Sequence, residues 1–226
     1  MTTPVSLPLT RRSLLAMAGA GLAAATFPRA LFAQSGKGVL IIASGQDIPN
    51  FDPHTATGYS ASFFLRNTYD PLVRVAGNPP EPVPAIAQSW EISTDGTEYV
   101  FHLNPAAKFH SGKPVTAEDV VYSFQRALKL AKGNAWMIRG IVTPENVTAV
   151  DPQTVRFKLS SPFAAFLQVL PWMFIAEKAA VEANLGSDNG EGWLMKNLAG
   201  SGPFALKRSQ AGTLHYLARV EDAWQS

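Results

Sequence analysis

The four histidines are the side chains in this sequence that could most directly bind a metal ion or transfer a proton. They are His54, His102, His110 and His215. A metal site needs converging ligands, which a helix supplies when two histidines stand three or four residues apart. None of the four has such a neighbour, and the chain contains no cysteine that could add a thiolate ligand. We therefore expect structural or surface roles for these histidines and no metal site.

Two other groups could suggest catalysis. Ser201 lies directly between Gly200 and Gly202, whereas a nucleophile elbow has the pattern G-x-S-x-G and a phosphate-binding loop needs a lysine at a fixed offset. Glu118 and Asp119 are adjacent, and neighbouring side chains on a helix point about 100° apart, so they do not converge as an acid and a base. Without a paired nucleophile and base, we expect the protein not to be an enzyme.

The N-terminus has the composition of an export signal. Arg11 and Arg12 precede an apolar run of about fifteen residues, shorter than the ~20 that a membrane-spanning helix needs. We interpret residues 1–33 as a twin-arginine-type signal peptide that is cleaved after Ala33. Export through the general route, and a permanent anchor, are the alternatives. The predicted location is periplasmic.

The charge balance depends on this signal. Three of the 19 Lys and Arg residues lie within residues 1–33, and none of the 17 Asp and Glu residues does. The mature chain would be nearly neutral, which gives no support for nucleic acid as a partner. The absence of cysteine also excludes a disulfide scaffold and a lipid-modified N-terminal cysteine.

The stretch from Trp90 to Leu128 has the clearest local signals. Its second strand alternates apolar and polar side chains, with the apolar ones at Tyr99, Phe101 and Leu103. Asp95-Gly96 predicts the turn before this strand. Thr116 stands three residues ahead of Asp119, which is a carboxylate variant of the capping box and predicts the start of a helix. A glycine at position 133 is the predicted end of that helix.

Other patterns place strands before and after this stretch. Val39–Ala43 is a continuous apolar run, which predicts a buried strand that leads into a loop at Gly45. Loops at strand ends often meet ligands. Residues 147–150 and 155–159 predict a hairpin, and residues 213–219 predict a final strand.

The order SWE-x-S-x-DG, then KFH-x-G-x-P-x-TAEDV-x-YS, resembles the extracytoplasmic solute-binding proteins of family 5. These are the dipeptide, oligopeptide and nickel receptors of ABC importers. Three further segments resemble family elements: residues 50–54 the LDPH element, Tyr69–Val73 the YDPLV element, and Gly200–Phe204 the GTGPY element. Most of these residues turn and cap a scaffold, so they indicate the family and say little about the ligand.

The resemblance implies an α/β fold of the type II periplasmic binding-protein kind, present in part. Residues 34–58 would form the first segment of lobe I, residues 59–170 a small α+β domain II, and residues 171–226 the return into lobe I. In the family a further long segment follows the GTGPY element and builds the second lobe. We therefore expect that this sequence is the N-terminal portion and that the second lobe is missing.

The resemblance implies a periplasmic substrate-binding component of a peptide-type ABC importer, without a cofactor. Its partners would be a small solute, such as a peptide, and ABC permease subunits in the inner membrane. The alternatives are a nonfunctional truncated remnant and an exported interaction module with no transport role. A small exported hydrolase is a third class, which the missing nucleophile and base disfavour.

The candidate ligand-binding residues are Gly45, Trp136, Trp172, Ser201 and Phe204. The loop position that matches Trp136 is a tryptophan in the ligand cleft of the nickel-type receptor. Amphipathic aromatic groups serve both pockets and cores, so a core position is the alternative for Trp136. The arginine that accompanies this tryptophan in that receptor has no counterpart, because residues 170–173 read Leu-Pro-Trp-Met.

Overall fold

The computed structural model describes residues 38–225, and the structural statements below concern these residues. Residues from Ser44 onward form one compact unit, and residues 38–43 lie outside it and are described separately. The predicted signal peptide, residues 1–33, lies outside the described part. Between residues 38 and 225, no helix combines the length and the apolar character that crossing a membrane requires.

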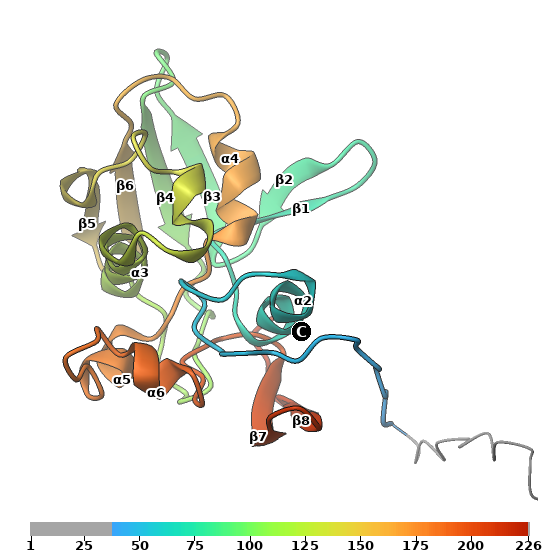
Figure 1. Ribbon diagram of the computed structural model, residues 1–226. Helices are drawn as coiled ribbons and strands as arrows, with labels where there is room; N and C mark the ends of the chain where they lie inside the picture. Colours follow the sequence, from blue (N-terminus) through green and yellow to red (C-terminus); the bar gives the residue numbers. More distant parts are fainter. Residues whose placement is uncertain (1–37, 226) are drawn as a thin grey trace, which may run out of the picture. The chain divides into compact units, whose positions relative to one another are not determined.

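A four-stranded antiparallel sheet is the largest element of the compact unit (Figure 1). Its strands are β3 (Ala87–Ile92), β4 (Glu98–Leu103), β5 (Val147–Asp151) and β6 (Thr154–Lys158), in the order β3-β4-β6-β5. On β4 the side chains of Tyr99, Phe101 and Leu103 are buried and those between them are partly exposed. The alternation and both hairpins predicted from the sequence are confirmed.

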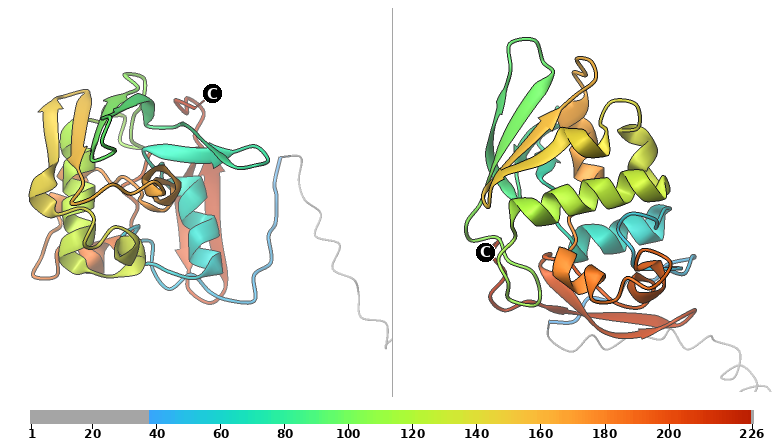
Figure 2. Two further views of the ribbon diagram at one scale, coloured as in Figure 1. Left: turned by 90° about the horizontal axis from the view of Figure 1, so that it is seen from above. Right: turned by 90° about the vertical axis from the view of Figure 1, so that its left-hand side faces the viewer.

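Helix α3 (Ala117–Leu130) lies across one face of this sheet (Figure 2). Its start is the predicted one: Asp119 Oδ2 accepts hydrogen bonds from the Thr116 amide at 3.0 Å and from the Thr116 hydroxyl at 2.7 Å. The predicted end was wrong, because the helix stops before Gly133. Ala131 already takes the left-handed conformation, with φ at 54°.

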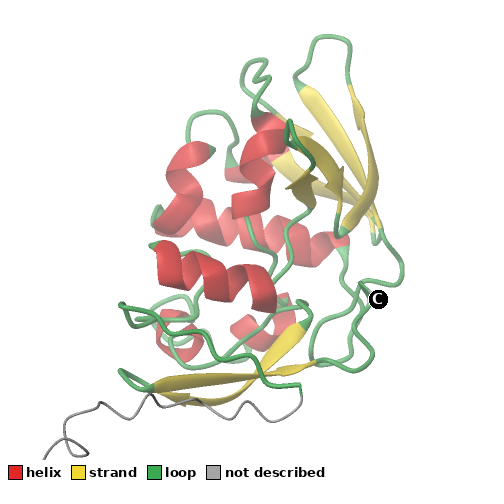
Figure 3. Ribbon diagram, turned by 90° about the vertical axis from the view of Figure 1, so that its right-hand side faces the viewer, coloured by secondary structure: helices red, strands yellow, loops and turns green. Residues whose placement is uncertain are grey.

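The remaining elements are short. They are α2 (Tyr59–Thr68), β1 (Val73–Ala76), β2 (Glu81–Pro84), the 3-10 turns η1 (Gly133–Met137), η2 (Pro144–Asn146) and η3 (Leu170–Trp172), α4 (Phe166–Val169), α5 (Lys178–Glu182), α6 (Glu191–Leu194), β7 (Phe204–Gln210) and β8 (Leu214–Arg219). β1 pairs with β2, and β7 pairs with β8, both antiparallel. Figure 3 shows helices between the four-stranded sheet and the β7–β8 hairpin.

Two groups of buried apolar side chains stabilise the unit. The sheet core joins the sheet, α3 and α4; its aromatic members are Tyr99, Phe101, Phe109, Phe124, Phe157 and Phe166. The α2 core joins α2 to segments before and after it, and includes Phe51, Phe64, Leu65, Tyr69, Phe174 and Val181. Helix α2 therefore packs with residues that come before position 59 and after position 170. The domain boundaries drawn from the sequence stay a prediction.

One strand prediction was wrong. Val39–Ala43 has no regular structure, and its side chains are exposed, Leu40 to 83 %. A strand needs a neighbour for its N–H and C=O groups, and this segment pairs with no strand of the described residues. A continuous apolar run shows that burial is favourable but does not show which segment provides the partner.

Candidate functional site

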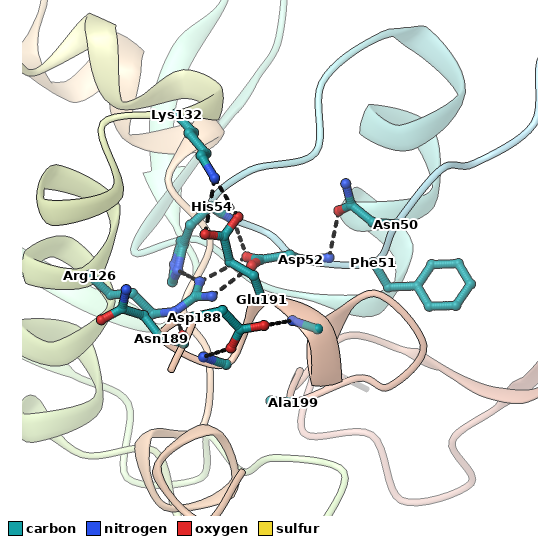
Figure 4. A network of polar contacts seen from close by, with 12 residues as sticks. Asn50, Phe51, Asp52, His54, Arg126, Lys132, Asp188, Asn189, Glu191 and Ala199 are labelled. Carbon is teal, nitrogen blue, oxygen red and sulfur yellow. Dashed lines mark hydrogen bonds and ion pairs between the residues drawn. The ribbon is translucent and has the colours of Figure 1, made fainter. Parts of the chain in front are cut away.

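A buried ion pair joins the loop before α2 to helix α3 (Figure 4). Arg126 donates from Nη1 to Asp52 Oδ1 at 2.8 Å and from Nη2 to Asp52 Oδ2 at 2.6 Å, which is the bidentate geometry of a strong arginine–carboxylate contact. Arg126 is only 4 % exposed and Asp52 is fully buried. Burial alone would raise the pKa of Asp52, but the hydrogen bonds from Arg126 and the nearby positive charge outweigh it and hold this pKa below its ordinary value.

His54 completes the cluster as a neutral side chain. Its Nε2 lies 3.0 Å from the carbonyl oxygen of Phe174, so Nε2 carries the proton, because a carbonyl can only accept. Its Nδ1 then accepts from Arg126 Nη1 at 2.8 Å. Burial lowers the pKa of His54 to about 4; Asp52 opposes this shift and Arg126 adds to it. A second proton would have to be placed on Nδ1, against the guanidinium.

The Asp52–His54–Arg126 cluster fixes neighbouring segments. Arg126 Nε also donates to the carbonyl oxygen of Asn189 at 2.9 Å, which connects α3 to the loop before α6. Gly133, at the start of η1, packs so closely on the loop that a Cβ there would lie 2.5 Å from the His54 carbonyl oxygen. The loop before α2 and the turn that carries Trp136 are therefore held against each other.

Sequence reasoning missed Arg126. An arginine in a helix normally faces solvent, and its carboxylate partner lies 74 residues earlier in the chain. One signal was present: Asp119, Ser123 and Arg126 are buried and follow a helical i, i+4, i+7 spacing on α3. A polar stripe on the buried side of a helix indicates a buried network.

Trp136 is exposed, which settles its position against the core alternative. Its exposed fraction is 69 %. Two more aromatic side chains, Tyr59 and Phe63, are exposed on one side of α2, four residues apart. Exposed aromatic groups on a rigid support are typical of ligand-binding surfaces.

Trp172 lies on η3 and is partly buried under a cation. The Cζ atom of Arg66, from α2, lies 4.3 Å from the centre of the Trp172 ring, which is a cation–π contact. The backbone of Trp172 also meets η1, since Asn134 Nδ2 donates to its carbonyl oxygen at 3.4 Å. The turns that carry Trp136 and Trp172 are thus neighbours.

Gly45 lies in an exposed loop near the first turn of α2. The hydroxyl groups of Ser44 and Ser60 are 2.7 Å apart, which ties this loop to the helix. A Cβ at Gly45 would meet no atom within 4 Å, so packing does not require glycine there.

Ser201 and Phe204 lie at the other end of α2. Ser201 is 2 % exposed and its hydroxyl donates to Asp70 Oδ2 at 2.9 Å. Its carbonyl oxygen accepts from Trp224 Nε1 at 3.1 Å and from Gln225 Nε2 at 3.0 Å. Phe204 begins β7 and is partly buried. These contacts are within the protein scaffold.

A Gly-Ser-Gly sequence indicates a backbone turn so tight that only glycine allows it, and the structure corrects this interpretation for Gly200 and Gly202. Neither glycine has a positive φ, so the backbone turn does not demand glycine. Instead, a Cβ on Gly200 would lie 2.0 Å from the Thr68 carbonyl oxygen, and one on Gly202 would lie 2.6 Å from the Thr68 carbonyl carbon. Glycine is needed there because the segment passes directly against the end of α2.

The candidate residues therefore fall into two groups. Gly45 lies by the first turn of α2, whereas Trp172 lies over Arg66 in the last turn and Ser201 lies just beyond that end; the turn of Trp136 adjoins that of Trp172. A helix of ten residues is ~15 Å long, so one small ligand would not contact both ends. The ligand contacts of all five residues stay a prediction.

A cavity borders Ser201. Its volume is about 520 Å³, and the turn 108–112 and residues 218–224 form much of its wall. His110 contributes to this wall, with its Nε2 2.8 Å from the Gly202 carbonyl oxygen. Neither Trp136 nor Trp172 borders this cavity. Within residues 38–225, no three histidine, aspartate or glutamate side chains gather as a metal site would need.

Comparison with known proteins agrees with this architecture. Residues 81–226 match the bacterial extracellular solute-binding proteins, family 5. The chain is 42 % identical over 129 residues to the probable D,D-dipeptide-binding periplasmic protein DdpA of Escherichia coli, covering 56 % of this chain and 24 % of that one. It is 31 % identical over 244 residues to the periplasmic oligopeptide-binding protein OppA of the same organism, covering 96 % and 44 %.

A solved structure shows the same fold. The periplasmic binding protein DppA from Helicobacter pylori, in complex with the peptide STSA, is 30 % identical and superposes with a TM-score of 0.69, covering 79 % of this chain and 38 % of that chain. The predicted α/β fold of type II periplasmic binding proteins, in part, is confirmed. The chain spans less than half the length of the proteins it matches. The motifs, the fold and the matched residues together place this chain in family 5 of the bacterial extracellular solute-binding proteins.

Proposed function

We propose that this chain forms one wall of the binding site of an exported peptide receptor, which delivers its ligand to an ABC importer. The observation that carries the proposal is Trp136, an indole exposed to 69 % on a turn whose first residue packs against His54. A large aromatic group held rigidly in water is positioned to bind a ligand with little loss of conformational entropy.

The mechanism is capture without chemistry. In receptors of this kind two lobes close around a solute by a hinge motion, and the enclosed ligand loses water on both sides. The Asp52–His54–Arg126 cluster would keep the loop before α2 and the turn of Trp136 in place during closure. Such a receptor breaks no bond and needs no nucleophile.

The location and the partners follow from the same proposal. Relatives are named as periplasmic proteins, which supports an exported location for this chain. The finer proposal is that residues 1–33 are a twin-arginine-type signal, cleaved after Ala33. ABC permease subunits of the inner membrane would be its protein partners and a short peptide its ligand.

The division into domains is also a proposal. Residues 34–58 and 171–226 would belong to lobe I and residues 59–170 to small domain II. The packing of α2 with Phe51 and Phe174 supports moving the start of domain II to the end of this helix, near Tyr69.

Titration of the purified chain with a panel of di- and tripeptides, followed by calorimetry and tryptophan fluorescence, tests the function. We expect dissociation constants no better than ~1 mM, about −4 kcal/mol, because one wall supplies only part of the contacts. Trp136→Ala should abolish the residual binding. Tyr216→Ala, which removes another exposed aromatic group, on β8, should leave the binding unchanged. Peptide binding that does not depend on Trp136 would refute the proposed wall.

A further inference from the structure

Arg66 is a cation whose hydrogen-bonding edge is free. Its guanidinium lies over the Trp172 ring, with Cζ 4.3 Å from the ring centre. Stacking uses the flat face of the guanidinium and leaves its N–H donors available at the edge. In the part of the chain that the structure describes, Arg66 makes no hydrogen bond and no ion pair. A positive charge is thus held in place by an aromatic ring without an acidic partner.

A small cavity opens beside this arginine. Its volume is about 210 Å³. Its wall is formed by Arg66, Pro71, Arg74, Val75, Pro171 and Phe174. Four of these side chains are apolar and two are arginines, and no acid contributes to the wall. Whole small-molecule ligands usually occupy ~300–1,000 Å³, so this cavity fits one part of a larger ligand.

The second arginine is already paired. Arg74 Nη2 forms an ion pair with Asp70 Oδ1, and this carboxylate also accepts from Ser201 and Gln225. Asp70 is fully buried among these donors and forms no ion pair with Arg66. The charge that faces the cavity without compensation is therefore that of Arg66.

The chemistry of this pocket fits a carboxylate attached to an apolar group. A guanidinium edge binds a carboxylate with two parallel hydrogen bonds, and proline, valine and phenylalanine walls accept an aliphatic side chain. Both features occur together at the last residue of a peptide. We propose that Arg66, stacked on Trp172, binds the C-terminal carboxylate of a short peptide whose last side chain enters this cavity. This inference rests on the proposed function and assigns one subsite of the ligand.

The test compares a peptide acid with its amide by NMR titration of the purified chain. The probes are Ala-Leu, Ala-Leu-amide and acetyl-Ala-Glu-amide, which carries only a side-chain carboxylate. We expect Ala-Leu to shift the Nε–H resonance of Arg66 and to bind at least fivefold more tightly than the other two. Arg66→Gln should weaken the binding of Ala-Leu at least fivefold and leave the binding of Ala-Leu-amide unchanged.

Two further variants serve as controls. Arg66→Lys keeps the charge but loses the planar fork, so we expect it to restore less than half of the lost affinity. Arg208→Gln removes another exposed arginine, on β7, and should leave the affinity for Ala-Leu unchanged. An unchanged thermal midpoint in Arg66→Gln shows that the fold is intact.

The outcomes separate the inference from the function on which it rests. If Ala-Leu and its amide bind equally, or if Arg66→Gln has no effect while Trp136 still responds to peptide, the subsite is refuted and the receptor function stands. If acetyl-Ala-Glu-amide binds as tightly as Ala-Leu, the assignment to the peptide C-terminus is wrong. If no peptide changes the fluorescence of Trp136 or the Nε–H resonance of Arg66, the proposed function itself is refuted.

Discussion

Two buried carboxylates flank α2, and their partners differ. Asp52, before the helix, pairs with Arg126, whose side chain is 3 % exposed. Asp70, after the helix, pairs with Arg74, four residues away and 40 % exposed, and has the Ser201 hydroxyl and the Gln225 amide as additional donors. Beyond Arg126, Asp52 accepts one further hydrogen bond, from the His54 amide at 2.9 Å, whereas Asp70 accepts two from side chains far away in the sequence. We infer that substitutions around Asp52, at the start of α2, destabilise the protein strongly. Substitutions around Asp70, at the end of α2, should have smaller effects on stability.

Removal of the two arginines tests this comparison with the largest expected effect. Arg126→Met should lower the free energy of unfolding by about 3–5 kcal/mol, because Asp52 would remain buried without a counter-charge. Arg74→Met should lower it by about 1 kcal/mol or less, since Arg74 is partly exposed and Asp70 keeps two other donors. Urea unfolding measures both. Equal losses would mean that the two ends do not differ.

The pH dependence of stability sharpens the description of the Asp52 end. His54 has a pKa of about 4 in the folded protein and 6.5 ordinarily, so the unfolded chain binds more protons between these values. The contribution of neutral His54 to the free energy of unfolding is fully present above pH 6.5. It is lost as the pH falls toward 4, by roughly 3 kcal/mol in total. The charged groups that face His54 are Asp52 and Arg126.

Thermal unfolding between pH 4 and pH 7 checks this expectation. His54→Gln should reduce the slope of stability against pH. Burial also lowers the pKa of His110, so part of the slope should persist in His54→Gln. A slope that His54→Gln leaves unchanged would show that His54 is not the titrating group.

Steric change at the Asp70 end has a smaller expected effect. Gly200→Ala should lower stability by about 1–3 kcal/mol, because the new methyl group would overlap the Thr68 carbonyl oxygen and the segment must shift. Gly45→Ala introduces the same methyl group into open space and serves as the matched control. Chemical denaturation compares the two. If Gly45→Ala is the more harmful, the close approach at Thr68 does not determine the packing.

The smallest expected effect is that of Ser201→Ala. The variant removes one hydrogen bond to Asp70, which retains Arg74 and Gln225, so we expect a loss of about 1 kcal/mol. Ser187→Ala, in the exposed loop before α6, provides a baseline near zero. A loss as large as that of Arg126→Met would contradict the idea that the Asp70 end shares its charge among donors.

The sequence predicted the features that depend on neighbouring residues. The alternation on β4, the turn at Asp95-Gly96 and the pairing of Thr116 with Asp119 are all set by side chains within a few positions of one another. The two longest family motifs lie in this same region, so the fold could be assigned without any long-range contact. The exposed position of Trp136 was one of two alternatives that the sequence left open.

Features that depend on distant residues were missed. Nothing near Arg126 in the sequence indicates Asp52, and nothing near Trp172 indicates Arg66, because each pair is joined only by packing of separate elements. The apolar run at Val39–Ala43 indicated burial without identifying a partner strand. The glycines beside Ser201 were correctly noticed, but their reason lies in Thr68, more than a hundred residues earlier.

The position of Arg126 has a consequence for how the molecule opens. Its helix contributes Val120, Phe124 and Ala127 to the sheet core, while its guanidinium holds the loop that carries Phe51 into the α2 core. Separation of the two cores would leave a carboxylate and a guanidinium buried apart, which is unfavourable. The two cores should therefore unfold as one cooperative unit, and the slowest-exchanging amides of α2 and α3 should report the same opening free energy in native-state hydrogen exchange.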